Sequence, residues 1–220
     1  MSEETKPWKS MRTSSGWANF MAKRAPALHK EWLGMFIAST KRGKLSEKMK
    51  HLVWVATDVV VTHLYSPGAV LHAQEALAHG ATLAEVMDTL RLACIPATRG
   101  LHEGYAVLAE AMAAKQGGTA SDFAASFSTE FTRSYQAFID GQLQDGLDAR
   151  SRLLVRLAVV SNPATAYRDE TRTTIHQALE LGVDPEELLE VMEISSLITS
   201  HAFSITLSGL AASMDNRLAD

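Results

Sequence analysis

Histidines that can exchange protons gather in one part of the chain. Five of the eight lie between positions 51 and 102, and imidazole is the side chain that changes charge near neutral pH. His72 stands about one turn inside a helix expected to start at a proline–glycine break, where the chain bends around a ligand. His63 and Tyr65 lie beside that break, and His51 stands about three turns before His63 on the preceding helix. We predict that His72, His63 and His51 act as acid or base groups, with Tyr65 as a hydrogen-bond donor.

Charged residues that can hold a substrate carboxylate accompany these histidines. Arg99 begins a later helix together with His102, and a guanidinium binds a carboxylate through two parallel hydrogen bonds. The alternative for Arg99 is a solvated ion pair with Glu103, four residues on. Glu75 lies on the same predicted helix as His72, and Arg168 flanks an equivalent break later in the chain. The predicted substrate-binding set is therefore Arg99, His102, Glu75 and Arg168.

A metal site built on the same histidines is an alternative. His72, Glu75 and His79 are spaced i, i+3 and i+7 and so share one helix face, where two nitrogens and a carboxylate can hold a divalent ion. The two histidines, however, stand about 10 Å apart along the helix, which is too far for one ion. His72 with Glu75, assisted by His63 or His102, is a better set. We predict no bound metal and no cofactor, and keep this alternative open.

The elements that position these residues occur twice in the chain. Moving the sequence along itself by 102 positions brings its two halves into register without a gap over roughly ninety residues. The matches include Phe36 with Phe138, Tyr65 with Tyr167, Gly80 with Gly182 and Glu85 with Glu187. We predict an N-terminal arm at 1–19, a first repeat at 20–116 and a second repeat at 122–215, joined at Gly117–Gly118.

The second repeat lacks the histidines of the first. At the positions 102 residues later stand apolar or hydroxyl side chains: Leu153, Thr165, Thr174, Leu181 and Ser204. After a duplication, this asymmetry indicates that the first repeat keeps a reaction centre and the second supports it.

Start and stop signals indicate helices throughout each repeat. Ser46 precedes a helix to about His63, which the sequence Ser66-Pro67-Gly68 interrupts, and a second helix follows to His79, with Gly80 as its C-terminal cap. Thr82 and Glu85 form a capping box for the next helix. Its counterpart in the second repeat opens with Asp184-Pro185-Glu186-Glu187, an N-cap, a first-turn proline and acidic residues. No alternating pattern indicates a sheet, so we predict an all-α fold.

One stretch resembles a known family. The sequence LSEKMKHLVWVATDVVVTHLYSPGAVLHAQEALAHGAT, followed by LAEVMDTLRLA, is similar to the carboxymuconolactone decarboxylase family and its alkylhydroperoxidase-D-like relatives. Residues 147–190 repeat the pattern, so the resemblance covers most of the chain in tandem. It implies a tandem, alkylhydroperoxidase-D-like helical bundle, a pocket facing His72, and self-association, with a trimer of two-repeat chains imitating six single-repeat chains.

The chain departs from the redox members of that superfamily. Those members carry a Cys-x-x-Cys four residues before the helical histidine. Here Tyr65 and Gly68 occupy these positions in the first repeat, and Tyr167 and Glu170 occupy them in the second. The single cysteine, Cys94, lies among apolar residues and excludes an intrachain disulfide. Thiol-peroxidase chemistry needs a poised thiolate, so we do not expect it.

Composition limits the partners and the compartment. With 21 basic and 25 acidic residues the formal net charge is -4, which gives no electrostatic reason to expect nucleic acid. The apolar run at 52–64 is too short to cross a bilayer, and the first residues lack the apolar core of a secretory signal. We expect a cytoplasmic homo-oligomer with a small-molecule carboxylate as substrate and no membrane partner.

These observations favour an enzyme. The leading hypothesis is a cofactor-independent decarboxylase or isomerase, a lyase-like enzyme that acts on a small carboxylated lactone or an intermediate of aromatic breakdown with histidine acid–base chemistry. Two alternatives stay open: a metal-dependent enzyme that uses the histidines of the first repeat, and a non-catalytic protein that binds a small acid or serves as a scaffold.

Overall fold

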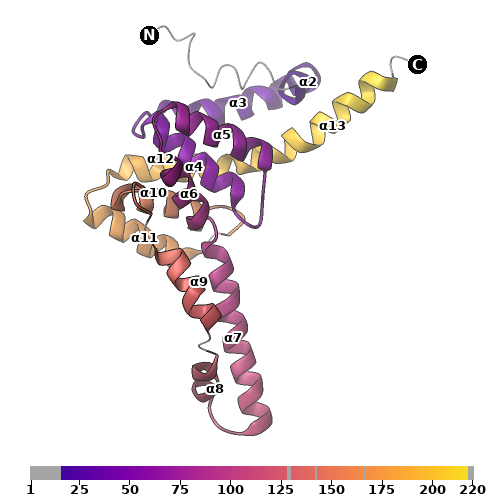
Figure 1. The fold of residues 1–220 in the computed structure, drawn as a ribbon. Helices are drawn as coiled ribbons and strands as arrows, with labels where there is room; N and C mark the ends of the chain where they lie inside the picture. Colours follow the sequence, from indigo (N-terminus) through magenta and orange to yellow (C-terminus); the bar gives the residue numbers. More distant parts are fainter. Residues whose placement is uncertain (1–15, 128–129, 142, 166, 218–220) are drawn as a thin grey trace. The chain divides into compact units, whose positions relative to one another are not determined.

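The computed structural model describes residues 16–127, 130–141, 143–165 and 167–217, and the regular structure of these residues is entirely helical (Figure 1). This confirms the predicted all-α class. The helices gather into two compact units, Met1–Gly43 with Ser196–Asp220, and Lys44–Ser195.

The smaller unit joins the two ends of the chain. It contains α2 (Gly16–Arg24), α3 (Pro26–Lys41), the short 3-10 helix η2 (Leu197–Ser200) and α13 (His201–Arg217), which packs on α2. Trp17 meets Trp32 edge to face with ring centroids 4.9 Å apart. Most of the predicted arm, residues 1–15, lies outside the described residues, and positions 16–19 already belong to α2.

The larger unit is built around two buried helices. These are α4 (Glu47–Val59) and α10 (Ala149–Val160), which pack against each other and against α6 (Leu83–Leu92). Every residue of α4 from 49 to 58 is buried, so this helix forms the centre of the core. Helix α5 (Ser66–Ala78) packs on α4, and α11 (Arg168–Glu180) packs on α10.

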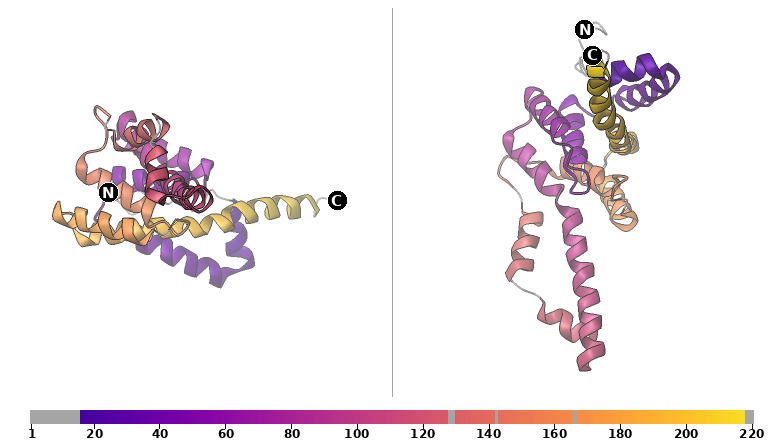
Figure 2. Two further views of the ribbon diagram at one scale, coloured as in Figure 1. Left: turned by 90° about the horizontal axis from the view of Figure 1, so that it is seen from below. Right: turned by 90° about the vertical axis from the view of Figure 1, so that its right-hand side faces the viewer.

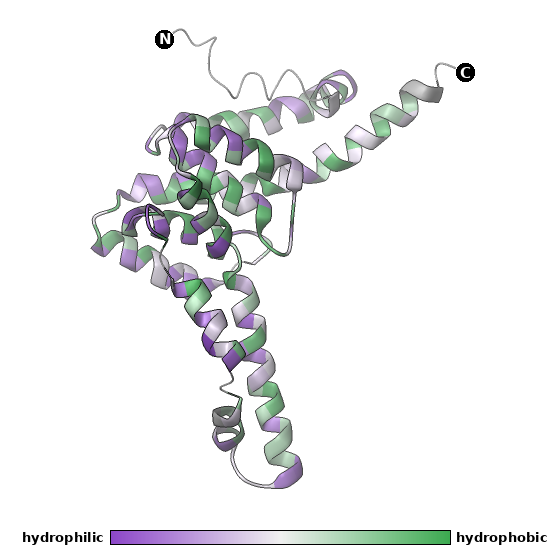
Figure 3. Ribbon diagram, in the orientation of Figure 1, coloured by the Kyte–Doolittle hydropathy of each residue, from purple (hydrophilic) through white to green (hydrophobic). Residues whose placement is uncertain are grey.

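A long helix extends from this unit. Helix α7 (Ile95–Gln116) is followed by α8 (Ala120–Ser126) and α9 (Glu130–Asp140), which lie along it in the views of Figure 1 and Figure 2. Figure 3 shows apolar residues along α7, and Val107 and Leu108 are among its exposed apolar side chains. The last helix of the unit is α12 (Pro185–Ser196).

The predicted start and stop signals are present. Ser46 caps α4 by accepting a hydrogen bond from the backbone N–H of Met49, and Thr82 and Glu85 form both bonds of the capping box. Gly80 adopts a φ of +88°, a left-handed conformation that glycine reaches without steric cost. The predicted helix ends therefore follow from local chemistry.

One boundary differs from the expectation. Helix α4 ends at Val59 rather than near His63, and residues 66–68 form the first turn of α5 rather than the break. The chain turns at Val60, whose carbonyl accepts hydrogen bonds from the N–H groups of His63 and Leu64. Pro67 suits the first turn of a helix, where its missing N–H is not needed.

Helix starts recur at the predicted spacing. The pairs α4 and α10, α5 and α11, and α6 and α12 each begin 102 residues apart. The cap glycine recurs too, since Gly182 has a φ of +81°. The compact units divide the chain differently from the two repeats, so the repeat boundaries at 20–116 and 122–215 stay a prediction.

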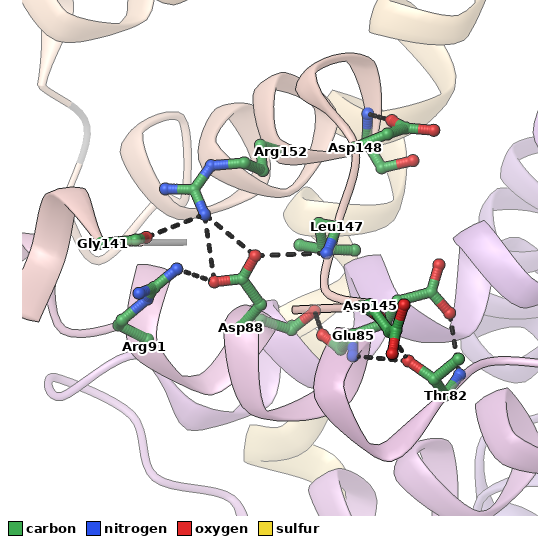
Figure 4. Close-up of polar contacts among 11 residues, drawn as sticks. Thr82, Glu85, Asp88, Arg91, Gly141, Asp145, Leu147, Asp148 and Arg152 are labelled. Carbon is green, nitrogen blue, oxygen red and sulfur yellow. Dashed lines mark hydrogen bonds and ion pairs between the residues drawn. The ribbon is translucent and has the colours of Figure 1, made fainter. Parts of the chain in front are cut away.

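Two buried carboxylates join the two predicted repeats through hydrogen bonds and ion pairs. Asp88 on α6 is 1% exposed and accepts hydrogen bonds from the backbone N–H of Leu147, at 3.2 Å, and from Arg152, at 2.9 and 3.0 Å (Figure 4). Arg91 completes the cluster from the same helix as Asp88. Because both chain segments that bind Asp88 come from beyond residue 140, this carboxylate joins the halves of the unit.

The second carboxylate makes the reciprocal contacts. Glu190, 102 residues after Asp88, is fully buried and accepts hydrogen bonds from the backbone N–H groups of Lys44, at 2.8 Å, and Leu45, at 2.9 Å. Its other oxygen lies 3.7 Å from Nζ of Lys50. Leu45 and Lys50 are the counterparts of the leucine and arginine that bind Asp88, so a carboxylate of each predicted repeat binds the beginning of the other.

One stretch of the described chain, Pro185–Met214, passes a test of length and apolar composition for crossing a membrane, with a mean hydropathy of 1.2. The 3-10 helix η2 divides it. Its first part, α12, carries the buried carboxylates of Glu187 and Glu190, which pair with Arg150 and Lys50. Helix α12 is therefore a packed helix of the larger unit.

Candidate functional site

A seam between α4 and α5 brings two predicted histidines into contact. His51 Nδ1 lies 3.0 Å from His72 Nδ1, and both side chains are buried. Trp54 stacks on the His72 ring, with centroids 5.1 Å apart and an angle of 9° between the planes. In a hydrogen bond between them one nitrogen donates and the other accepts, so the two rings adopt complementary tautomers. Burial lowers the pKa of His51, which favours the neutral imidazole.

The outer end of the seam adds a carboxylate and a third histidine. The His79 ring lies parallel to that of His51, with centroids 5.5 Å apart and an angle of 12°. Glu75 Oε2 lies 3.9 Å from His79 Nε2. One nitrogen or oxygen of each of His51, Glu75 and His79 falls within 4.8 Å of the other two. The outer end therefore gathers three potential metal ligands.

The inner end of the seam lies at the break between the helices. The N–H of Tyr65 donates to the Asp58 carbonyl at 2.7 Å, and the rings of His63 and Tyr65 are 6.1 Å apart. Burial raises the pKa of Asp58 to about 8, so its carboxyl group is protonated at neutral pH, and burial lowers the pKa of His63. At Gly68 a Cβ would overlap the Asp58 carboxylate and lie 2.7 Å from the Tyr65 ring. Only glycine fits there.

An apolar pocket of about 300 Å³ opens beside the seam. It lies between α4, α5 and α6 and is lined by Val55, Val59, Leu64, Ser66, Ala69, Val70, Ala73, Val86 and Leu90. The buried histidines are not part of this lining. The pocket can hold the apolar body of a small molecule, but it supplies almost no polar groups to orient one.

A second pocket, of about 330 Å³, combines residues of both predicted repeats. It is lined by Ile95, Thr98, Arg99, His102 and Glu103 of α7, and by Arg156, Tyr167 and Glu170 from α10 and the start of α11. We call it the arginine pocket. Its volume is in the range of pockets that bind small molecules, and its lining carries two guanidinium groups and an imidazole.

The charges of the arginine pocket are partly compensated. Arg99 donates to Glu103 at 2.7 Å and lies 3.6 Å from Glu170, and its guanidinium stands 4.2 Å from the centre of the Tyr167 ring. The hydrogen bond to Glu103 raises the pKa of Arg99. Within the described part of the chain, the buried Nε of Arg156 has no hydrogen-bond partner. The lining of the pocket thus includes a guanidinium whose buried Nε–H is not satisfied by the described residues.

In the structure, most of the predicted site residues lie in one of two places, the seam between α4 and α5 or the arginine pocket. His51, His72, Glu75, His63 and Tyr65 lie along the seam between α4 and α5. Arg99 and His102 line the arginine pocket. Arg168 is exposed at the start of α11 and is not part of that lining. Glu75 accompanies the histidines rather than the arginines.

Sequence reasoning missed several residues of both places. Asp58 could have been identified from the sequence as a candidate site residue, because it is an acidic residue inside an apolar run. Tyr167 and Glu170 occupy the positions of the missing thiols in the second repeat, which placed them near a site without assigning them a role. Arg156 is the counterpart of Trp54, and nothing in its own sequence context distinguishes it from a surface arginine.

Comparison with known proteins supports the fold. No protein-family model and no curated protein matches the chain. Among solved structures it is similar to a crystal structure from Burkholderia xenovorans LB400 named "putative gamma-carboxymuconolactone decarboxylase subunit". The TM-score is 0.80, and the alignment covers 93% of this chain and 92% of that chain at 19% identity. A likeness at this identity shows the architecture, and it confirms the predicted carboxymuconolactone decarboxylase-like fold.

Proposed function

We propose, from the premise of a carboxymuconolactone decarboxylase-like fold, that this chain is a cofactor-independent lyase or isomerase of a small carboxylated molecule, and that the substrate binds in the arginine pocket. The observation that carries the proposal is the pair of guanidinium groups, Arg99 and Arg156, on one pocket with His102. In this proposal the Arg156 guanidinium on the pocket lining binds the substrate carboxylate through parallel hydrogen bonds.

The pocket supplies the groups that decarboxylation needs. Loss of carbon dioxide from a carboxylated lactone breaks the bond to the carboxyl carbon, and the electron pair moves into the conjugated carbonyl as an enolate. Arg99 stabilises the negative charge that develops on the enolate oxygen. His102 then donates a proton to the carbon that lost its carboxylate. An isomerase uses the same groups, with a proton removed from carbon in place of the lost carbon dioxide.

The seam offers a rival position for the proton donor. His72 and His51 form a buried pair, and the sequence favours His72 as the catalytic acid, assisted by His63 and Tyr65. His72 lines neither of the two pockets, whereas His102 lines the arginine pocket. We therefore place the proton transfer at His102 and treat His72 as the residue to be tested against it.

The experiment compares four single variants on a panel of carboxylated lactones, with carbon dioxide release and product formation as readouts. We expect Arg156→Met and His102→Gln each to lower kcat/KM at least a hundredfold, about 3 kcal/mol. His72→Gln should have a smaller effect. Arg172→Met is the matched control, because Arg172 is an exposed arginine of α11 that pairs with Asp169.

Three outcomes oppose the proposal. A hundredfold loss in His72→Gln with an active His102→Gln moves the centre to the seam. Full activity in Arg156→Met removes the arginine pocket from catalysis. Tight binding of an acid without conversion, followed by native mass spectrometry before and after incubation, indicates a protein that binds small acids without turning them over.

A further inference from the structure

We propose that the outer end of the seam binds a divalent transition-metal ion, with His51, Glu75 and His79 as its three ligands. Two imidazoles and a carboxylate form a ligand set that Zn²⁺ and its neighbours in the first transition series prefer. This site lies apart from the arginine pocket, whose lining it does not share. The inference is therefore independent of the proposed function.

The three ligands are already close to the spacing that a metal requires. Their donor atoms fall within 4.8 Å of one another. Ligands at about 2.1 Å from a tetrahedral ion are about 3.4 Å apart, so closing the site requires shifts on the order of 1 Å. The side chains of Glu75 and His79 are 31% and 32% exposed, so they have room to rotate, and His51 is held in the core.

His72 suits the role of a positioning residue behind the first ligand. A histidine that binds a metal through one ring nitrogen usually donates from the other, which fixes its tautomer and orientation. When His51 donates from Nδ1 to His72 Nδ1, its Nε2 keeps the lone pair that a metal needs. Trp54, stacked on His72, in turn limits the rotation of that ring.

The surrounding charges permit a cation. The ammonium of Lys50, whose charge acts on His51, is engaged by Glu47 at 2.9 Å and by Glu190 at 3.7 Å. Three protein ligands leave one position of a tetrahedral ion open, and the exposure of Glu75 and His79 gives it access to solvent. A water or a small anion completes the coordination.

The second repeat provides an internal comparison. At the positions of His51, Glu75, His79 and His72 it carries Leu153, Gln177, Leu181 and Thr174. All the proposed ligands and the positioning histidine are absent together from the repeat that shares the fold. Glu75 on α5 and His79, the residue that follows the helix, form a surface ion pair. That pair does not explain why the buried His51 ring lies parallel to the His79 ring, with the ring centroids 5.5 Å apart.

The experiment measures metal binding directly. Protein purified without a histidine tag and treated with chelator is titrated with Co²⁺, followed by visible absorption, and with Zn²⁺, followed by calorimetry and by the melting temperature. We expect one ion per chain, a Co²⁺ spectrum of low coordination number, and a higher melting temperature with Zn²⁺ because the ion binds the folded state.

Variants assign the ligands. Glu75→Gln and His79→Gln change side chains that are partly exposed, so both should fold, and each should weaken binding at least a hundredfold. His72→Leu, which changes a positioning residue, should weaken binding ten- to a hundredfold and alter the Co²⁺ spectrum. His102→Gln is the control and should bind the ion as the unchanged protein does. The proposal is overturned if the protein takes up no stoichiometric ion, or if binding survives both Glu75→Gln and His79→Gln.

Discussion

The two predicted repeats share their framework and differ along one seam. At equal positions both have an N-cap, a glycine with positive φ and a buried carboxylate that holds the other repeat. Along the seam, by contrast, the first repeat places histidines, an aspartic acid and a glycine where the second places leucines, threonines, Val160 and Glu170. The comparison teaches that groups which stabilise the fold are present in both predicted repeats, whereas the ionisable groups of the seam are present only in the first.

The largest expected effect tests the paired framework. Asp88→Ala and Glu190→Ala should each destabilise the protein by about 3 kcal/mol or more, because each leaves buried cations and backbone N–H groups without their acceptor. Urea unfolding measures both.

The control for this pair is Arg172→Ala, which removes an exposed ion pair with Asp169 and should cost well under 1 kcal/mol. A large effect at Asp88 with none at Glu190 would show that only one of the two buried carboxylates contributes to stability. The two carboxylates would then not have equivalent roles.

The next prediction concerns the crowded start of α5. Gly68→Ala should destabilise the protein by about 1 to 3 kcal/mol, because the added methyl group meets the Asp58 carboxylate and the Tyr65 ring. The counterpart in the second repeat, Glu170→Ala, removes atoms from a partly exposed side chain and should change the free energy of unfolding by less than 1 kcal/mol. Equal losses at both positions would mean that the two breaks are packed alike.

The buried carboxyl group of the first repeat should appear in the pH dependence of stability. The folded-state pKa of Asp58 is about 8, above the ordinary value of 3.8, so the folded protein holds a proton that the unfolded chain releases. Its contribution to stability is therefore present at acid pH and is lost as pH rises from about 4 to about 8, by up to about 1.4 kcal/mol per pH unit.

Asp58→Asn imitates the protonated acid and should remove this slope. The measurement is urea unfolding of both proteins at several pH values between 5 and 8. Burial lowers the pKa values of both His51 and His63, so these residues contribute in the opposite direction in both proteins. The difference between the two profiles reports the titration of Asp58 together with its effect on the neighbouring His63. Parallel pH profiles would show that Asp58 is ionised in the fold.

The smallest effect is expected at the helix caps. Ser46 and Asp148 stand 102 residues apart and cap α4 and α10 through the N–H groups of Met49 and Ser151. Ser46→Ala and Asp148→Ala should each cost about 1 kcal/mol, measured by thermal or urea unfolding. Costs that differ by more than about 1 kcal/mol would indicate that the two helices depend on different contacts.

Local signals were enough to predict most of the fold. Thr82 with Glu85, Gly80 and the Asp184-Pro185 start act within one turn of the chain, and their hydrogen bonds are present in the structure. The end of α4 could not be placed, because it depends on a turn at Val60 in which the apolar pattern continues without interruption. The contacts of Asp88 and Glu190 with the other predicted repeat were not predicted from the sequence, because residues such as Asp88 and Leu147 come together only through tertiary folding.

The sequence predicted the types of residue in the candidate site better than it predicted which of these residues lie together. Histidine chemistry in the first repeat and the carboxylate-binding role of Arg99 with His102 stay predictions. The sequence placed His51 about three turns before His63 on one helix, whereas the reversal of the chain after α4 brings His51 onto His72. Arg156 could not be assigned, since its place on the arginine pocket depends on how α10 packs beside α7.

The reciprocal contacts of Asp88 and Glu190 also constrain the order of folding events during synthesis. When Asp88 is added to the growing chain, the leucine N–H and the arginine that will bind it are more than fifty residues from being made. Until then water must solvate its carboxylate, so α6 cannot reach its final burial. Maturation of the core therefore waits for the later half of the polypeptide, and a nascent fragment that stops before residue 152 should remain open to chaperones and proteases.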